Sequence, residues 1–88
     1  MNKIYIVYEV EEHYNWKNDN YDKEFIDIFY ASSLEKAKEF LQKAIAEKYY
    51  ELTLTTKIMI RESCIDRYDD NFNMFFEGKI SKFLKLKI

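Results

Sequence analysis

Proline is absent from this 88-residue chain, and glycine occurs only once, at Gly78. One glycine cannot build the Gly-rich loops that cradle phosphates, so nucleotide-binding motifs of that type are excluded. The only cysteine, Cys64, excludes a disulfide within the chain and is typical of a reducing compartment. A metal site around His13, the only histidine, could draw on nearby Glu11, Glu12, Asp19 and Asp22. However, zinc sites normally have several His or Cys ligands and calcium loops a fixed pattern, and this segment matches neither. We therefore expect no cofactor, no metal and no catalytic activity.

Long apolar runs are also missing. The apolar run near the start, IYIVY, has five residues and is followed by acidic side chains, so it does not have the form of a signal peptide. A membrane-spanning helix needs roughly 18 or more apolar residues in a row, and no run approaches that length. These features predict a cytoplasmic protein that does not contact a membrane.

Aromatic residues, in contrast, are abundant. The chain contains eight Tyr and seven Phe, and 48% of its residues are apolar, whereas disordered segments have few aromatic residues. The length and composition predict a single folded domain over 1–88. Its charge is uneven, since residues 1–30 carry a net charge of −4 and residues 79–88 carry +4. Such a distribution permits the acidic end to bind a basic partner and the basic end to bind an acidic one.

The periodicity of apolar residues predicts an α+β fold. An amphipathic helix is expected over 32–50, begun by a capping box between Ser32 and Glu35. Alternating patterns predict strands over 3–10, 24–30, 57–66 and 77–88, the first of them central. Residues 11–23 and 67–76 are expected to be loops, and 51–56 are ambiguous. The simplest architecture is a two-layer sandwich: a four-stranded antiparallel sheet (ββ-α-ββ) with one helix packed on one face.

One helix covers only one face of such a sheet. By the alternation along the strands, the other face would carry a set of large apolar side chains: Tyr5, Val7, Phe25, Phe29 and Met59. A small monomer rarely exposes so much apolar surface. Two explanations stay open: the face joins two copies of the chain in a homodimer, or one of the loops folds across it.

The two expected loops combine acidic and aromatic residues. Aromatic side chains are frequent hot spots of protein interfaces, so both loops are candidate partner-binding segments. Their candidate residues are Tyr14, Trp16, Asp19, Tyr21 and Asp22 in the first, and Tyr68, Asp69, Asp70 and Phe72 in the second.

Other reactive side chains are expected to be structural or solvated. His13 is predicted to lie in a solvated loop, and Cys64 to be a buried thiol on the helix side of the sheet. The carboxylates of Asp66, Asp69 and Asp70 lie near strand ends, where solvation is the default. The lysines of the final strand (Lys79, Lys82, Lys85 and Lys87) fit protection of a sheet edge better than nucleic-acid binding.

Several segments resemble a small uncharacterised domain family of bacteria and their phages. They are IYIVYE at 4–9, FIDIFYASSLEKAKEFLQKA at 25–44, the strand with Arg61-Glu62 and Ile65-Asp66, and Glu77-Gly78. Phe75 stands where the family tends to have Trp, and the hairpin loop is longer here. The resemblance implies the ββ-α-ββ fold, and it implies no activity because none is assigned to the family.

The expected function is a non-catalytic protein–protein interaction module. Ile, Lys, Asn, Tyr and Phe, which have AT-rich codons, make up 43 of the 88 residues, and this favours an AT-rich bacterium, its phage or a mobile element. The concrete hypothesis is a phage accessory protein that inhibits a basic, nucleic-acid-binding host defence protein, as anti-CRISPR inhibitors do. The alternative is a small nucleic-acid-binding regulator that uses the lysine-rich final strand.

Overall fold

Four antiparallel strands form one open sheet in the order β2-β1-β3-β4. The computed structural model describes residues 3–64 and 73–87. The strands are β1 (Lys3–Asn15), β2 (Asn20–Ala31), β3 (Lys57–Cys64) and β4 (Asn73–Lys79). The predicted α+β fold with a four-stranded antiparallel sheet is confirmed, and β1 is central as expected. None of the helices in the described ranges is long and apolar enough to cross a membrane.

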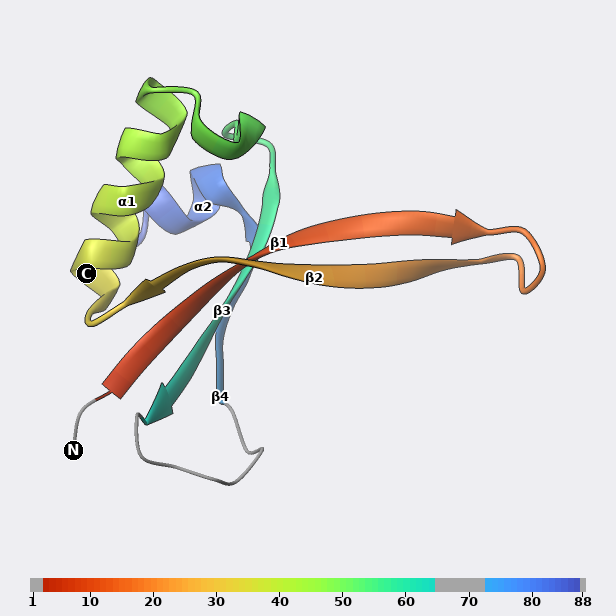
Figure 1. Cartoon of the computed structure of the whole chain (residues 1–88), viewed down its shortest axis with the longest axis horizontal. Helices are drawn as coiled ribbons and strands as arrows, with labels where there is room; N and C mark the ends of the chain where they lie inside the picture. Colours follow the sequence, from red (N-terminus) through yellow and green to blue (C-terminus); the bar gives the residue numbers. More distant parts are fainter. Residues whose placement is uncertain (1–2, 65–72, 88) are drawn as a thin grey trace.

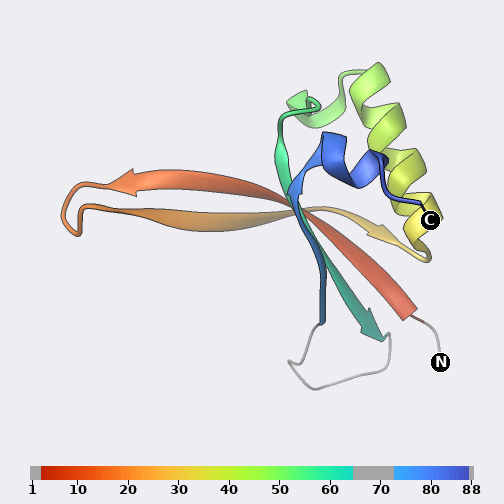
Figure 2. The same ribbon diagram turned by 180° about the vertical axis from the view of Figure 1, so that it is seen from behind.

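The helices gather on one face of the sheet. Helix α1 (Leu34–Ala46) packs nearest β1 and the end of β2, and the short α2 (Ile80–Leu84) lies beside it on the same side (Figure 1, Figure 2). A one-turn 3₁₀-helix, η1 (Tyr49–Glu51), follows α1. The core forms where these elements meet, and its fully buried members include Val7, Leu41, Ile58, Ile60, Ile80 and Phe83.

The start of α1 differs by one residue from the prediction. Ser33 is the N-cap, and its Oγ accepts a hydrogen bond from the backbone N–H of Lys36 at 3.1 Å. The reciprocal capping box expected between Ser32 and Glu35 is therefore wrong, since the residue three after the cap is a lysine. The helix also ends earlier than residue 50, because Lys48 has a left-handed backbone conformation that no α-helix continues.

The strand predicted over 77–88 is wrong beyond Lys79, and β4 begins earlier than expected, at Asn73, inside the loop predicted over 67–76. The chain leaves the sheet after Lys79 and forms α2, in which Ile80 and Phe83 are both fully buried. Their spacing, with half-buried Leu84, is that of one helical face. The backbone N–H of Ile80 donates to the Thr56 carbonyl at 3.0 Å, and that of Ser81 donates to the Leu54 carbonyl at 3.0 Å. The ambiguous segment 51–56 thus anchors the start of α2.

The five residues predicted to form an uncovered face do not lie together. Val7 is fully buried beneath the helices, and Tyr5 and Phe29 pack against the same core. The Phe29 ring stacks on Phe40 of α1 with centroids 4.0 Å apart. Phe25 and Met59 do lie on the opposite face, where Phe25 is 39% exposed and Met59 only 3%. The homodimer prediction rested on a single uncovered apolar face, and these five residues do not form one.

The face opposite the helices is partly closed by the coiling of the sheet. Lys23 belongs to edge strand β2 and Glu77 to edge strand β4, and strands three positions apart in a flat sheet are roughly 14 Å apart. Their Nζ and Oε1 atoms are nevertheless 3.2 Å apart. Coiling of this degree leaves Val10 and Met59, both on that face, largely buried. Within segment 11–23, one of the expected loops, Glu12 and Lys23 reach this face through ion pairs with Lys57 and Glu77.

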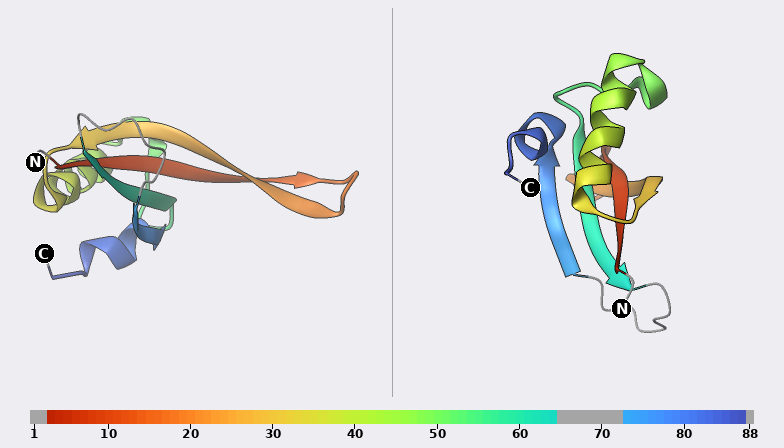
Figure 3. Two further views of the ribbon diagram at one scale, coloured as in Figure 1. Left: turned by 90° about the horizontal axis from the view of Figure 1, so that it is seen from below. Right: turned by 90° about the vertical axis from the view of Figure 1, so that its left-hand side faces the viewer.

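The loop predicted over 11–23 is wrong, because most of these residues lie in the paired strands β1 and β2. Strands β1 and β2 stay paired from Tyr5↔Ala31 to Asn15↔Asn20, well past the end of their pairing with β3 at Glu9↔Ile58. Residues 11–15 pair with 20–24, and with the turn that joins them they form a twisted two-stranded ribbon, here called the arm. The arm projects from the body (Figure 1, Figure 3). The described chain extends 44 × 35 × 21 Å along its principal axes.

Candidate functional site: the arm

The arm turns back at residues 16–19. The side-chain Oδ1 of Asn15 accepts a hydrogen bond from the backbone N–H of Lys17 at 3.1 Å, and the Asn15 carbonyl accepts from Asn18 at 3.3 Å. Asp19 takes a left-handed conformation, with φ of 49°, before the chain enters β2. Asn and Asp tolerate these conformations better than other non-glycine residues. They therefore close a hairpin in a segment that has no glycine.

One face of the arm is aromatic toward its tip. Tyr14 and Tyr21 lie directly opposite each other on β1 and β2, with ring centroids 5.3 Å apart. The adjoining turn carries Trp16, whose ring lies 5.9 Å from the Lys17 ammonium. The exposed fractions are 54% for Tyr14, 75% for Trp16 and 62% for Tyr21. Tyr14 and Tyr21 pair with each other, Trp16 contacts Lys17, and all three rings leave most of their surface to solvent.

The Tyr14 hydroxyl is held by the turn. Its O–H donates a hydrogen bond to Oδ1 of Asp19. This bond to a carboxylate raises the pKa of the Tyr14 phenol above its usual value. The contact fixes the orientation of one ring at the arm tip, so part of the aromatic surface is held in place before any partner arrives.

The other face of the arm is acidic. Glu11 and His13 of β1 and Glu24 of β2 point to this side, and Nε2 of His13 lies 3.3 Å from Oε2 of each glutamate. Asp22 lies opposite His13, and its Oδ2 accepts a hydrogen bond from the Asn15 amide at 3.2 Å. Residues 11–24 contain five acidic side chains and two lysines, which gives a net charge of −3.

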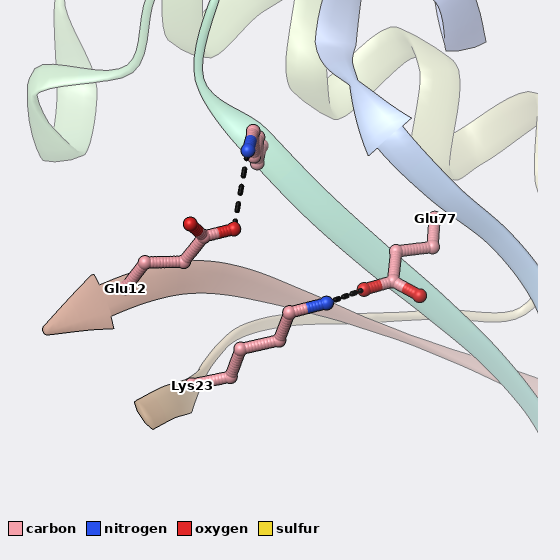
Figure 4. Close-up of polar contacts among 4 residues, drawn as sticks. Glu12, Lys23 and Glu77 are labelled. Carbon is pink, nitrogen blue, oxygen red and sulfur yellow. Dashed lines mark hydrogen bonds and ion pairs between the residues drawn. The ribbon is translucent and has the colours of Figure 1, made fainter. Parts of the chain in front are cut away.

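Two ion pairs connect the root of the arm to the body (Figure 4). Nζ of Lys57 on β3 lies 3.1 Å from Oε1 of Glu12, and Nζ of Lys23 lies 3.2 Å from Oε1 of Glu77. The side chains are between 34% and 52% exposed, so each pair is expected to contribute about 0–1 kcal/mol. Together they restrain the angle at which the arm leaves the sheet.

Aromatic packing supports the same root. The rings of Tyr8 and Phe25 meet edge to face with centroids 6.5 Å apart, and the Arg61 guanidinium lies 5.5 Å and 5.9 Å from them. Burial raises the pKa of the Tyr8 phenol, and the nearby Asp27 carboxylate adds to this, while Arg61 opposes it. This cluster covers apolar surface on the side of the sheet opposite the described helices.

The structure gathers four of the predicted binding residues. Tyr14, Trp16, Asp19 and Tyr21 lie together at the arm tip, while Asp22 faces the acidic side. Tyr68, Asp69, Asp70 and Phe72 lie outside the described residues, as does the side chain of Cys64. The prediction that His13 lies in a solvated loop is wrong in its local structure, since His13 lies in β1, although its side chain is 59% exposed.

Sequence reasoning did not place Glu24 beside Glu11 and His13. Their ligand atoms all lie within 4.8 Å of one another. The signal was available as two alternating patterns, Glu11-x-His13 before the Asn-rich turn and Asp22-x-Glu24 after it. It was overlooked because Asn and Asp in 11–23 favoured a loop, and side chains of a loop have no shared face.

A separate hollow lies on the body. It has a volume of about 560 Å³, is open to solvent, and is lined mainly by apolar and threonine side chains with one lysine and one glutamate: Ile45, Lys48, Glu51, Leu52, Thr53, Leu54 and Thr55. The hollow lies between the end of α1 and the segment before β3.

Comparison with known proteins gives no relative. The chain matches no family model, no curated protein and no solved structure.

Proposed function

We propose that this protein is a non-catalytic protein–protein interaction module and that the tip of the arm is its binding surface. The observation that carries the proposal is the exposure of Trp16, Tyr14 and Tyr21 at the end of a projecting ribbon. Trp and Tyr are enriched among interface hot spots because they bury much area with few rotatable bonds. Two paired rings on one face of the ribbon, with a third exposed ring in the adjoining turn, are suited to anchoring a partner.

The charge of the arm supports a basic partner. Its net charge of −3 favours association with a positively charged surface, and such complementarity mainly raises the association rate and selects the partner. A ribbon with acidic side chains on one face and aromatic rings on the other fits a basic nucleic-acid groove. The finer proposal is that the chain is a phage or mobile-element accessory protein that inhibits a host defence protein of this type.

Affinity capture with matched variants tests the proposal. Tagged wild-type protein, Trp16→Ala and Tyr49→Ala are compared in a nuclease-treated bacterial lysate at low and high salt. Tyr49 is a suitable control because it is also an exposed aromatic residue, 50% exposed, but lies on the body. Truncation of a hot-spot Trp typically costs about 2 kcal/mol or more, which is about 30-fold in dissociation constant. We expect Trp16→Ala to lose a bound protein that Tyr49→Ala retains.

The nucleic-acid alternative predicts the opposite pattern. The lysines Lys79, Lys82, Lys85 and Lys87 are exposed around α2 rather than aligned on a strand, and the acidic arm would repel phosphates. Steeply salt-dependent binding of DNA or RNA, weakened by Lys82→Gln and unaffected by Trp16→Ala, would contradict the proposal and favour this alternative.

A further inference from the structure

We propose that Glu11, His13 and Glu24 form a binding site for a divalent transition-metal ion, with Zn²⁺ as its representative. The three side chains lie on the acidic face of the arm, opposite the aromatic face assigned to partner binding. The inference goes beyond the proposed function and does not depend on it, because it concerns a different face and different residues.

The spacing of the ligand atoms matches the needs of the ion. Zinc binds His nitrogen and carboxylate oxygen at about 2.0–2.2 Å, so two ligands of a tetrahedral site are roughly 3.3–3.5 Å apart. Oε2 of Glu11 and Oε2 of Glu24 are each 3.3 Å from Nε2 of His13. The two oxygens lie within 4.8 Å of each other, a gap that a shared cation would draw closer.

The hydrogen-bonding capacity of His13 also favours an ion. Nε2 of an imidazole carries at most one hydrogen, and one N–H cannot point directly at two carboxylates. The two carboxylates that converge on this nitrogen also repel each other. A cation bound between the three groups would accept a lone pair from Nε2 and neutralise both carboxylates.

The kind of ion follows from the ligands. One imidazole with two carboxylates suits Zn²⁺ and its transition-metal neighbours, whereas Ca²⁺ and Mg²⁺ prefer oxygen ligands alone. Three protein ligands leave a fourth tetrahedral position for water. Because Glu11 and His13 belong to β1 and Glu24 to β2, the ion would join the two strands of the arm and limit its bending.

A titration with Zn²⁺ alone tests the site. His13 is the only histidine, so the ring ¹⁵N signals of a histidine-labelled sample report on this site without assignment ambiguity. We expect Nε2 to shift and to saturate at one equivalent of Zn²⁺. Calorimetry of Glu24→Gln should show affinity weakened by at least about tenfold, since even the loss of an outer-shell partner costs about 10–100-fold.

Glu12→Gln is the matched control. Glu12 is next to Glu11 in sequence but points to the other face of the arm, where it pairs with Lys57. It should leave the Zn²⁺ affinity unchanged, and all these side chains are exposed enough that the fold should persist. Unmoved His13 signals would overturn the proposal. Equal weakening by Glu12→Gln and Glu24→Gln would also overturn it, because that result indicates attraction to acidic charge in general.

Discussion

At the scale of single residues, the chain after α1 adopts left-handed conformations without glycine. The φ angles are 58° at Lys48, 56° at Tyr50 and 55° at Glu51. Such conformations cost L-residues roughly 1–2 kcal/mol each, because Cβ approaches the following carbonyl oxygen. In a chain with one glycine, the sharp reversal between α1 and β3 is therefore built from unfavourable backbone conformations.

Replacement of Lys48 by glycine should stabilise the protein. Lys48→Gly removes the Cβ contact at a position that ends the helix, and we expect the free energy of unfolding to rise by about 1 kcal/mol. Lys43→Gly, inside α1, is the control and should lower it by about 1 kcal/mol. Urea unfolding measures both, and a loss of stability in Lys48→Gly would show that the lysine side chain stabilises the turn.

The ionised carboxylate of Glu9 lowers the stability of the folded state, and the size of this effect depends on pH. Burial raises the pKa of its carboxyl, and the nearby Glu11 and Glu51 carboxylates add to this. On the sheet it lies between Ile26 and Ile58. A raised pKa means that the folded state favours the protonated form, so the penalty is absent at low pH and appears as pH rises through the folded-state pKa.

Glu9→Gln should accordingly stabilise the protein at neutral pH. The gain is expected to reach up to about 0.5 kcal/mol, a small value because the side chain is partly solvated. It should shrink on acidification, when the wild-type carboxyl becomes protonated. Thermal unfolding across a pH series measures the difference, and a gain that grows at low pH would contradict the assigned cause.

At the scale of elements, sequence reasoning found the parts with a strong apolar period. The central helix and three strands of the body follow from such periods, as at Ile58 and Ile60 or at Ala37, Leu41 and Ala44. It failed where polar pairs set the structure. The arm is held by its turn, by Tyr14–Tyr21 and by ion pairs at its root, none of which has an apolar period.

Helix α2 was missed for a related reason. Alternating lysines after Lys82 imitate a strand, whereas Ile80 and Phe83 already have helical spacing. Hydrogen bonds from Ile80 and Ser81 to residues 56 and 54 favour the helix over the strand. The local sequence does not reveal these tertiary contacts. The fold class was therefore predictable from the sequence. For the candidate site, the sequence indicated which residues belong to it but not that they lie on a projecting ribbon.

Removal of the arm should leave the body folded. Joining Val10 to Phe25 through Asn-Gly is suitable because these two residues lie opposite each other and Asn-Gly forms a tight hairpin. Two ion pairs are lost, each of about 0–1 kcal/mol, so the free energy of unfolding should fall by no more than about 2 kcal/mol. Loss of cooperative urea unfolding would show that the arm is part of the folding core.

At the scale of the whole molecule, the arm makes the shape less compact than the chain length requires. The Cα radius of gyration is 14.0 Å, against about 12 Å for a compact domain of this size. Small-angle scattering should show the arm-deleted protein close to the compact value and the wild type above it. Equal values for both would indicate that the arm folds onto the body in solution.

Light scattering on the same samples addresses self-association. The apolar residues that favoured a homodimer are mostly covered within one chain, with Val7 and Met59 buried. Homodimerisation stays a prediction, and a dimer that depends on the arm would place the aromatic tip at its interface.

Site-specific photo-crosslinking measures whether the arm tip contacts a protein partner. Benzoylphenylalanine is placed at position 16 or, as the control, at position 49, and each protein is irradiated in a nuclease-treated bacterial lysate. We expect a covalent adduct with one protein from position 16 and none from position 49. Adduct formation at position 49 but not at position 16 would contradict the proposed function.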